Sequence, residues 1–130
     1  MSLVDIAKKY YCEQMKNCPV STFLAANEYF ELGLSEADAA LVTGFGGGIG
    51  CGKICGTAAA SVAILGKLFS DRENLKEICA AYISEYEEYL GCGSIDCAII
   101  AAKNKTADNR CNETVIKTAK LLEKFVEKYR

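Results

Sequence analysis

The sequence contains no histidine among its 130 residues. Without an imidazole there is no histidine metal ligand, no Ser-His or Cys-His catalytic pair and no Cys-x-x-Cys-His haem attachment. Proline is almost as scarce, because the only one, Pro19, follows Asn17 and Cys18 in what we expect to be the first turn of a helix. These absences exclude several common kinds of active site and direct attention to cysteine.

Long apolar runs are missing as well. No stretch of about 18 apolar residues occurs, so no membrane-spanning helix is predicted, and residues 1–11 lack the apolar centre of a secretion signal. The net charge of −2 argues against nucleic acid or an anionic membrane as a partner, because both favour a basic surface. We therefore expect a cytoplasmic protein, and the length predicts a single domain over residues 1–130.

Apolar residues recur at helical spacing along most of the chain, and no run alternates polar and apolar residues as a strand would. The predicted fold class is all-α, a single-domain bundle of about six or seven helices. Apolar spacing, caps and helix breakers place the helices at about residues 3–16, 17–32, 36–43, 53–69, 71–90, 95–102 and 110–129. The expected N-caps are Asn17, Ser35, Ser70, Ser94, and Asp108 or Asn109.

A glycine-rich loop separates the third and fourth predicted helices, with seven glycines and two cysteines in residues 44–56. Glycine is favoured where the backbone turns at positive φ or approaches another group closely. Residues 47–53 read Gly-x-x-x-x-Gly-Lys, as in a phosphate-binding P-loop, but Ile54 stands where Ser or Thr would hold magnesium. A helix, not a strand, precedes the loop, so we disfavour nucleotide binding.

Eight cysteines without a secretion signal point to metal or redox use, not to a disulfide framework. Four of them fall at expected helix starts: Cys18, Cys55, Cys97 and Cys111. The free N–H groups and positive partial charge of a helix start stabilise a thiolate, which lowers the thiol pKa and makes a better nucleophile or metal ligand. We take these four as candidate redox thiols and metal ligands, with Cys51 as a further ligand.

The other cysteines are less informative. Cys12 and Cys79 lie within helices on apolar faces and are expected in the core, whereas Cys92 stays unassigned. No Cys-x-x-Cys pair occurs, so zinc-ribbon, ferredoxin and thioredoxin spacings do not apply. Scattered cysteines still share a site if the helix starts meet, with loop glycines lining the cofactor. The expected cofactor-binding glycines are Gly46, Gly47, Gly48, Gly50 and Gly56.

Several blocks of the sequence, in their order and spacing, resemble the redox-active protein family named for its C_GCAxxG_C_C cysteine signature. The blocks are Asn17-Cys18 with the helix after it, residues 43–50, Cys55-Gly56, residues 93–97, and Cys111 with residues 115–122. The resemblance covers residues 17 to about 126, and it implies that the family's four shared cysteines are those at the helix starts. Two positions depart from the signature: Thr57 replaces its alanine, and Ala60 replaces its final glycine.

Residues and resemblance together predict a redox-active or electron-transfer protein, an oxidoreductase if it is an enzyme, that works with a redox partner protein. Its four-cysteine site would bind an iron–sulfur cluster or another thiolate-bound metal, or cycle between thiols and a disulfide. One alternative is a non-catalytic helical module with a structural metal such as zinc. Another is a binding or oligomerisation protein in which the glycine loop and the small-residue helix after it form a homodimer seam, and the cysteines are merely buried.

Overall fold

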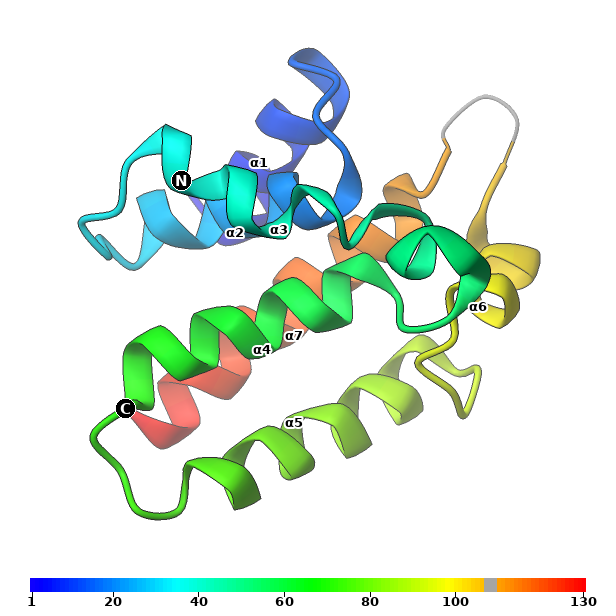
Figure 1. The fold of residues 1–130 in the computed structure, drawn as a ribbon. Coiled ribbons are helices and arrows are strands. Elements are labelled where there is room, and N and C mark those ends of the chain that lie inside the picture. The colour runs from blue at the N-terminus through cyan, green and yellow to red at the C-terminus, as the bar shows by residue number, and fades with distance from the viewer. Residues whose placement is uncertain (107–109) are drawn as a thin grey trace.

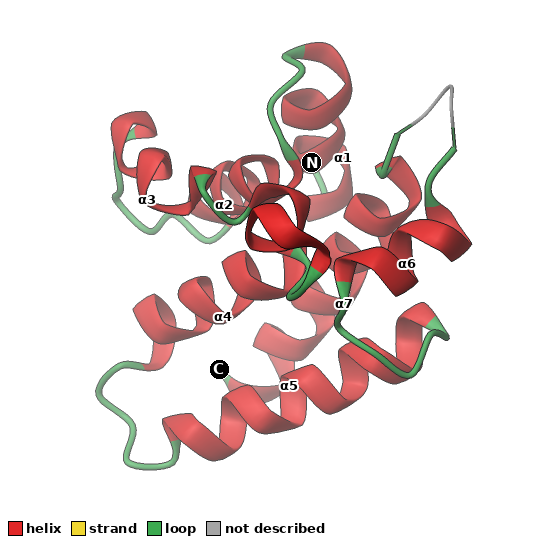
Figure 2. Cartoon of the chain, turned by 45° about the vertical axis from the view of Figure 1, so that its right-hand side comes forward, coloured by secondary structure: helices red, strands yellow, loops and turns green. Residues whose placement is uncertain are grey.

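The computed structural model describes residues 1–106 and 110–130 and contains seven α-helices (Figure 1). They are α1 (Leu3–Lys8), α2 (Cys18–Tyr29), α3 (Ala40–Thr43), α4 (Gly56–Phe69), α5 (Leu75–Leu90), α6 (Cys97–Asn104) and α7 (Asn112–Tyr129). Figure 2 shows only helices and loops, and no strand occurs in the part of the chain that is described. The predicted all-α fold is confirmed.

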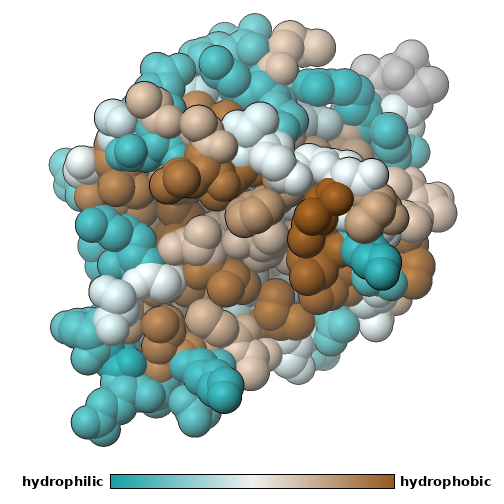
Figure 3. Space-filling view, in the orientation of Figure 1, coloured by the Kyte–Doolittle hydropathy of each residue, from teal (hydrophilic) through white to brown (hydrophobic). Residues whose placement is uncertain are grey.

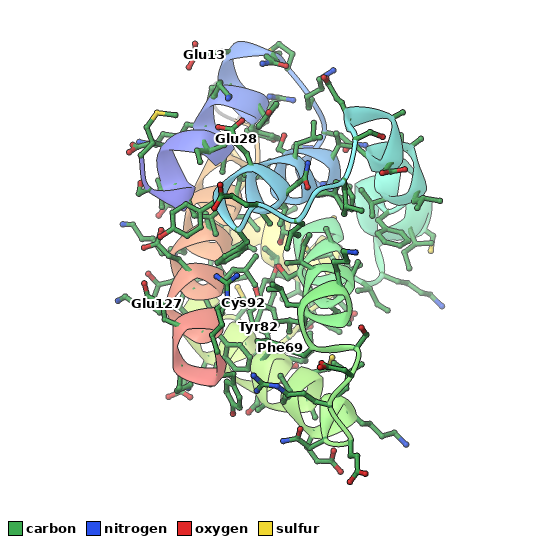
Figure 4. All side chains as sticks on the ribbon, turned by 90° about the vertical axis from the view of Figure 1, so that its left-hand side faces the viewer. Glu13, Glu28, Phe69, Tyr82, Cys92 and Glu127 are labelled. Atoms are coloured by element: carbon green, nitrogen blue, oxygen red, sulfur yellow. The ribbon has the colours of Figure 1, made fainter. Side chains whose placement is uncertain are left out.

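The helices form three layers, with α1 and α2 on one side, α4 and α7 in the middle, and α5 on the other side (Figure 1). The largest fully buried side chains come mainly from the middle layer and α5, among them Phe69, Tyr82, Tyr86 and Phe125. Phe69 and Tyr82 point into the space between α4, α5 and α7 (Figure 4). Each such side chain contributes roughly 2 kcal/mol of burial free energy, so this core fixes how α4, α5 and α7 sit.

Small side chains explain why α4 occupies the middle layer. Four residues of its first two turns are fully buried: Thr57, Ala58, Ala60 and Ser61. Such a thin face lets neighbouring backbones approach closely, and α4 packs against α2, α5 and α7. The small-residue face is therefore used inside the chain, as the central helix of the bundle.

Two predicted N-caps are confirmed. The Asn17 side chain accepts a 3.0 Å hydrogen bond from the Val20 N–H at the start of α2. Ser35 forms a capping box with Asp38 and opens a short 3₁₀ turn, Glu36–Ala39, that leads into α3.

Other predicted helix boundaries are wrong. The first helix ends at Lys8 and continues as a π-helical turn, Lys9–Glu13. Ser70 follows the end of α4 and does not cap α5, which begins four residues later than predicted, at Leu75. Ser94 accepts the N–H of Asp96 in a local turn instead of capping α6. The predicted cap at Asp108 or Asn109 lies outside the described residues.

The glycine-rich segment ends in an extended stretch, so α4 begins at Gly56 and not at residue 53 as predicted. Left-handed φ values occur at Gly47, Gly48, Ile49, Gly50 and Gly52, and the chain turns sharply there. It then runs antiparallel to the segment before α6. Ile54 and Asp96 form a β-bridge, and the Cys55 N–H donates to the Ile95 carbonyl at 2.7 Å. This pairing ties the loop to the start of α6.

Apolar side chains gather over the middle of the face shown in Figure 3, where α4 lies in Figure 1. A pocket of about 340 Å³ opens between α4, α5 and the segment before α6; it is lined by Ile54, Ala58, Ala59, Val62, Ile83 and Ile95. In the described residues, no helix has the length and apolar character needed to cross a membrane.

Candidate functional site

Four helices begin at the same end of the molecule, on the right in Figure 1, and each carries a cysteine there. Cys18 and Cys97 are the first residues of α2 and α6, and Cys55 and Cys111 are the N-cap residues of α4 and α7. The residues predicted to lie at helix starts therefore do so.

Two glycines allow these helix starts to meet. A Cβ atom at Gly56 would lie 2.8 Å from Pro19 Cδ and 3.0 Å from the Phe45 carbonyl, so the start of α4 presses directly on the start of α2. A Cβ at Gly48, whose φ is +65°, would lie 2.6 Å from Cys97 Cβ. Only glycine fits at these two positions. Because glycine has no side chain, the loop and α4 can pack directly against the cysteine-bearing segments.

Cys18 and Cys111 lie close enough for each thiol to shift the pKa of the other. The Cys111 N–H donates to the Tyr11 hydroxyl at 2.8 Å, and the Arg110 guanidinium stacks on the Tyr11 ring, 4.0 Å from its centroid. Arg110 also donates to the Tyr11 carbonyl at 2.7 Å. Tyr11 thus connects the end of the first helical segment to the start of α7 and fixes Cys111 beside Cys18.

The two thiols of this pair differ in charge. The hydrogen bond from Cys18 lowers the pKa of Cys111 to about 6, against the effect of burial, with further help from Lys105, Arg110 and the Tyr11 hydroxyl. The same hydrogen bond, burial and the negative charge of its neighbours raise the pKa of Cys18. These shifts favour the negative charge on Cys111 and the proton on Cys18.

The prediction of a lowered pKa at helix starts is wrong for two of the four cysteines. Burial raises the pKa of Cys97, and the nearby Cys55 and Cys111 charges act in the same direction. For Cys18 the neighbouring sulfur and burial outweigh the helix N-terminus. The partial charge of a helix end has a small effect on a thiol pKa. In a half-buried cluster of thiols, burial and the negative charge of neighbouring sulfurs outweigh it.

The four helix starts face one region of the molecule (Figure 1). Charge on Cys55 and Cys111 raises the pKa of Cys18 and of Cys97. The redox role of the four thiols stays a prediction. In the described residues, no three cysteine or carboxylate side chains form a group fit to hold a metal ion. The predicted metal-ligand role of these cysteines, with Cys51, stays a prediction.

A model of the protein family described as "Putative redox-active protein (C_GCAxxG_C_C)" matches residues 16–125, and this range includes all four helix-start cysteines. The chain belongs to this family. The resemblance seen in the sequence is thereby confirmed. The comparisons with curated proteins and with solved structures found no match.

The loop glycines of this C_GCAxxG_C_C protein do not share one role. Gly48 and Gly56 allow close approach, and Gly46 faces the Asn17 side-chain nitrogen, whereas Gly47 and Gly50 have open space where a Cβ would be. Their predicted cofactor-binding role stays a prediction.

The remaining cysteines of the C_GCAxxG_C_C protein lie apart from the four. Cys51 is exposed, and the left-handed residues before it remove the helical relation to Cys55 that the sequence suggested. Cys12 is exposed instead of in the core, and its thiol donates to the Asn112 side chain at 3.1 Å. Cys79 and Cys92 are half-buried.

Sequence reasoning missed the hydroxyl groups around the cysteines. Tyr11 contacts Cys111, and Tyr86 lies at hydrogen-bond distance from Thr57, next to Cys55. Thr57 was available as a signal, because it is a departure from the family signature two residues after a shared cysteine. Arg110, adjacent to Cys111, was another.

Proposed function

We propose that this redox-active protein acts by thiol–disulfide exchange, with Cys18 and Cys111 as its redox couple. What supports the proposal is the pair of neighbouring thiols at the starts of α2 and α7, in which the pKa of Cys111 is lowered and that of Cys18 is raised. The thiolate is the attacking species in disulfide exchange, and a pKa near the ambient pH balances the amount of thiolate against its nucleophilicity.

The exchange runs in two steps. The Cys111 thiolate attacks one sulfur of a substrate disulfide, forms a mixed disulfide and releases the first substrate thiolate. Cys18 then loses its proton and attacks the Cys111 sulfur, and the second substrate thiolate leaves and takes up that proton. The substrate disulfide gains two electrons, and the Cys18–Cys111 disulfide forms. A redox partner protein with a dithiol reverses the two steps and restores the thiols.

An iron–sulfur cluster or another thiolate-bound metal requires several ligands that converge on one point. In the described residues the side chains do not converge in this way. No step of the proposed exchange uses a metal, and metal content is an outcome of the test.

The test is a thiol titration of the reduced protein before and after treatment with oxidised glutathione, with metal analysis of the anaerobic preparation. We expect the loss of two thiols and a linked peptide pair containing Cys18 and Cys111. Cys18→Ser and Cys111→Ser should abolish that link, whereas Cys79→Ser, a half-buried cysteine of α5, should retain it. The absence of the link, or stoichiometric bound iron and sulfide, would contradict the proposal.

A further inference from the structure

Cys55 is the most deeply placed of the four thiols, with 5% of its surface exposed, and an external disulfide cannot reach it. Its sulfur lies 3.3 Å from the Thr57 hydroxyl. That hydroxyl is 2.8 Å from the Tyr86 hydroxyl on α5 and accepts a 3.0 Å hydrogen bond from Thr118 on α7. The three hydroxyl-bearing residues are almost fully buried. Cys55 therefore contacts a dry hydroxyl cluster contributed by three helices.

The number of hydrogen bonds that the Thr57 hydroxyl can donate and accept limits the directions of the hydrogen bonds in this cluster. A hydroxyl donates one hydrogen bond and accepts two, and Thr118 already uses one acceptor position. Of the contacts to Cys55 and Tyr86, one is therefore donated by Thr57 and the other accepted. Either Tyr86 donates to Thr57 and Thr57 to the Cys55 sulfur, or the direction is reversed. The first arrangement suits a Cys55 thiolate and the second a thiol, so the sulfur keeps a partner in both forms.

Tyr86 can serve as a donor because it keeps its proton. Burial raises the pKa of Tyr86, and the charge of Cys55 acts in the same direction. A thiolate at Cys55 would have little water to stabilise it, and donated hydrogen bonds to a buried anion replace that solvation.

Cys55 also lies next to the outer couple, which is the pair Cys18 and Cys111. Gly56 and Pro19, which follow Cys55 and Cys18, are in such close contact that a Cβ at Gly56 would lie 2.8 Å from Pro19 Cδ. Cys55 and Cys18 thus directly precede two residues in contact, and Cys18 is the sulfur of the outer couple on the side of Cys55.

We propose that Cys55 is an internal exchange thiol that forms a disulfide with Cys18 in place of Cys111, and that Thr57 and Tyr86 are its positioning residues. The inference rests on the proposed function of Cys18 and Cys111. The Cys55 sulfur attacks the Cys18 sulfur, the Cys18–Cys55 bond forms, the Cys18–Cys111 bond breaks, and Cys111 leaves with the electron pair. The proton of Cys55 passes to the departing sulfur and from there to solvent.

The direction of this step follows from solvent exposure. Cys55 is buried and Cys111 is half-buried, so water can reach the released Cys111 thiolate more easily than it can reach Cys55. The hydroxyl link through Thr57 is a feature of this chain, since the family signature has alanine at that position. The step returns Cys111 as a thiolate at the more exposed side of the site.

The test maps disulfides after treatment with oxidised glutathione, acid quenching and blocking of free thiols with N-ethylmaleimide. Mass spectrometry of the linked peptides gives the ratio of Cys18–Cys55 to Cys18–Cys111 at a fixed early time, before the two disulfides equilibrate, so the ratio reports the rate of the exchange step. We expect both links in the unaltered protein. Thr57→Val keeps the side-chain shape without the hydroxyl and should lower the ratio about tenfold, the effect of one hydrogen bond to a charged group. Thr57→Ser should restore it, and Tyr86→Phe should lower it.

Two matched controls separate the hydroxyl link from general packing. Tyr82 lies one turn before Tyr86 on α5 and is equally buried, but its hydroxyl donates to Ser61 at 2.9 Å. Thr114 is a buried threonine of α7 whose hydroxyl has no partner among the described residues. Tyr82→Phe and Thr114→Val should leave the ratio of the two disulfides unchanged.

The outcomes distinguish the two proposals. If Cys18–Cys111 forms without any Cys18–Cys55, the internal exchange is overturned and the outer couple stands. If Cys18 forms no disulfide, both are overturned. An unchanged ratio in Thr57→Val, or an equal fall in Tyr82→Phe and Thr114→Val, removes the positioning role of Thr57 and Tyr86.

Discussion

Cys18 and Cys111 both lie at the start of a helix, yet their thiol pKa values shift in opposite directions. Cys111 is closer to positive charge, with Arg110 beside it and Lys105 nearby, and its N–H donates to the Tyr11 hydroxyl. Cys18 is more deeply buried and has two sulfurs as its neighbours. A hydrogen bond shared by two such thiols places the proton on Cys18 and the charge on Cys111, which gives the couple a defined attacking sulfur.

The first prediction concerns the pH dependence of Cys111 alkylation by iodoacetamide, followed on the Cys111 peptide by mass spectrometry. The thiolate fraction grows as pH rises through the thiol pKa, so the rate should increase from pH 5 to pH 7 with a midpoint near 6 and then level off. Cys18→Ala removes the donated hydrogen bond and should move the midpoint upward.

Cys79→Ala is the control for this measurement, because Cys79 lies on α5 outside the cluster, and its removal should leave the midpoint in place. A midpoint near the ordinary thiol value of 9 in the unaltered protein would show that Cys111 is not the thiolate of the pair.

The start of α4 is tightly packed at the site, because its first residue, Gly56, touches the start of α2. Alanine is favoured over glycine within a helix, and this preference alone would make any glycine-to-alanine change in α4 stabilising. At Gly56 the added Cβ would instead meet Pro19 and the Phe45 carbonyl. This contact therefore determines whether Gly56→Ala raises or lowers the free energy of unfolding.

The second prediction compares Gly56→Ala with Gly66→Ala, two changes in the same helix measured by urea unfolding. Gly66 has no atom within 4 Å of an added Cβ, so its change should raise the free energy of unfolding by about 0.5–1 kcal/mol. Gly56→Ala should lower it by about 1–3 kcal/mol through overpacking. Equal effects of the two changes would mean that the starts of α2 and α4 are not in close contact.

In the whole molecule, the Cys18–Cys111 couple joins α2 of one outer layer to α7 of the middle layer (Figure 1). The two residues are separated by most of the chain. A disulfide that closes so long a loop restricts the unfolded chain strongly, by about 4 kcal/mol in the chain-entropy description. The free energy of unfolding of the whole protein should therefore differ between the oxidised and the reduced state.

The third prediction is that oxidation with glutathione raises the free energy of unfolding by about 4 kcal/mol, measured by urea unfolding of the oxidised and reduced protein. Cys18→Ser should remove the difference between the two states, whereas Cys79→Ser should keep it. An oxidised protein no more stable than the reduced one would indicate that no long-range disulfide has formed.

Most of the architecture follows from local sequence signals. Helical spacing of apolar residues gave the helices, Asn17 and Ser35 gave two of their caps, and the cysteine positions gave the four helix starts. These features depend on residues within one or two turns of each other, which is why they can be read along the chain. The same reasoning failed for Ser70 and Ser94: α5 begins four residues later than predicted and α6 two residues later, so a capping residue alone does not set the boundary.

The chemistry of the cysteines depends on residues distant in sequence. Arg110 contacts Tyr11 across 99 positions, and Thr118 contacts Thr57 across 61. Neither contact leaves a local pattern, because a side chain's pKa and hydrogen bonds are set by whatever the fold brings beside it. The amino-acid sequence therefore specified the helices and which cysteines begin them, and the packing of those helices decided which sulfur holds the charge and which one lies over the buried hydroxyls.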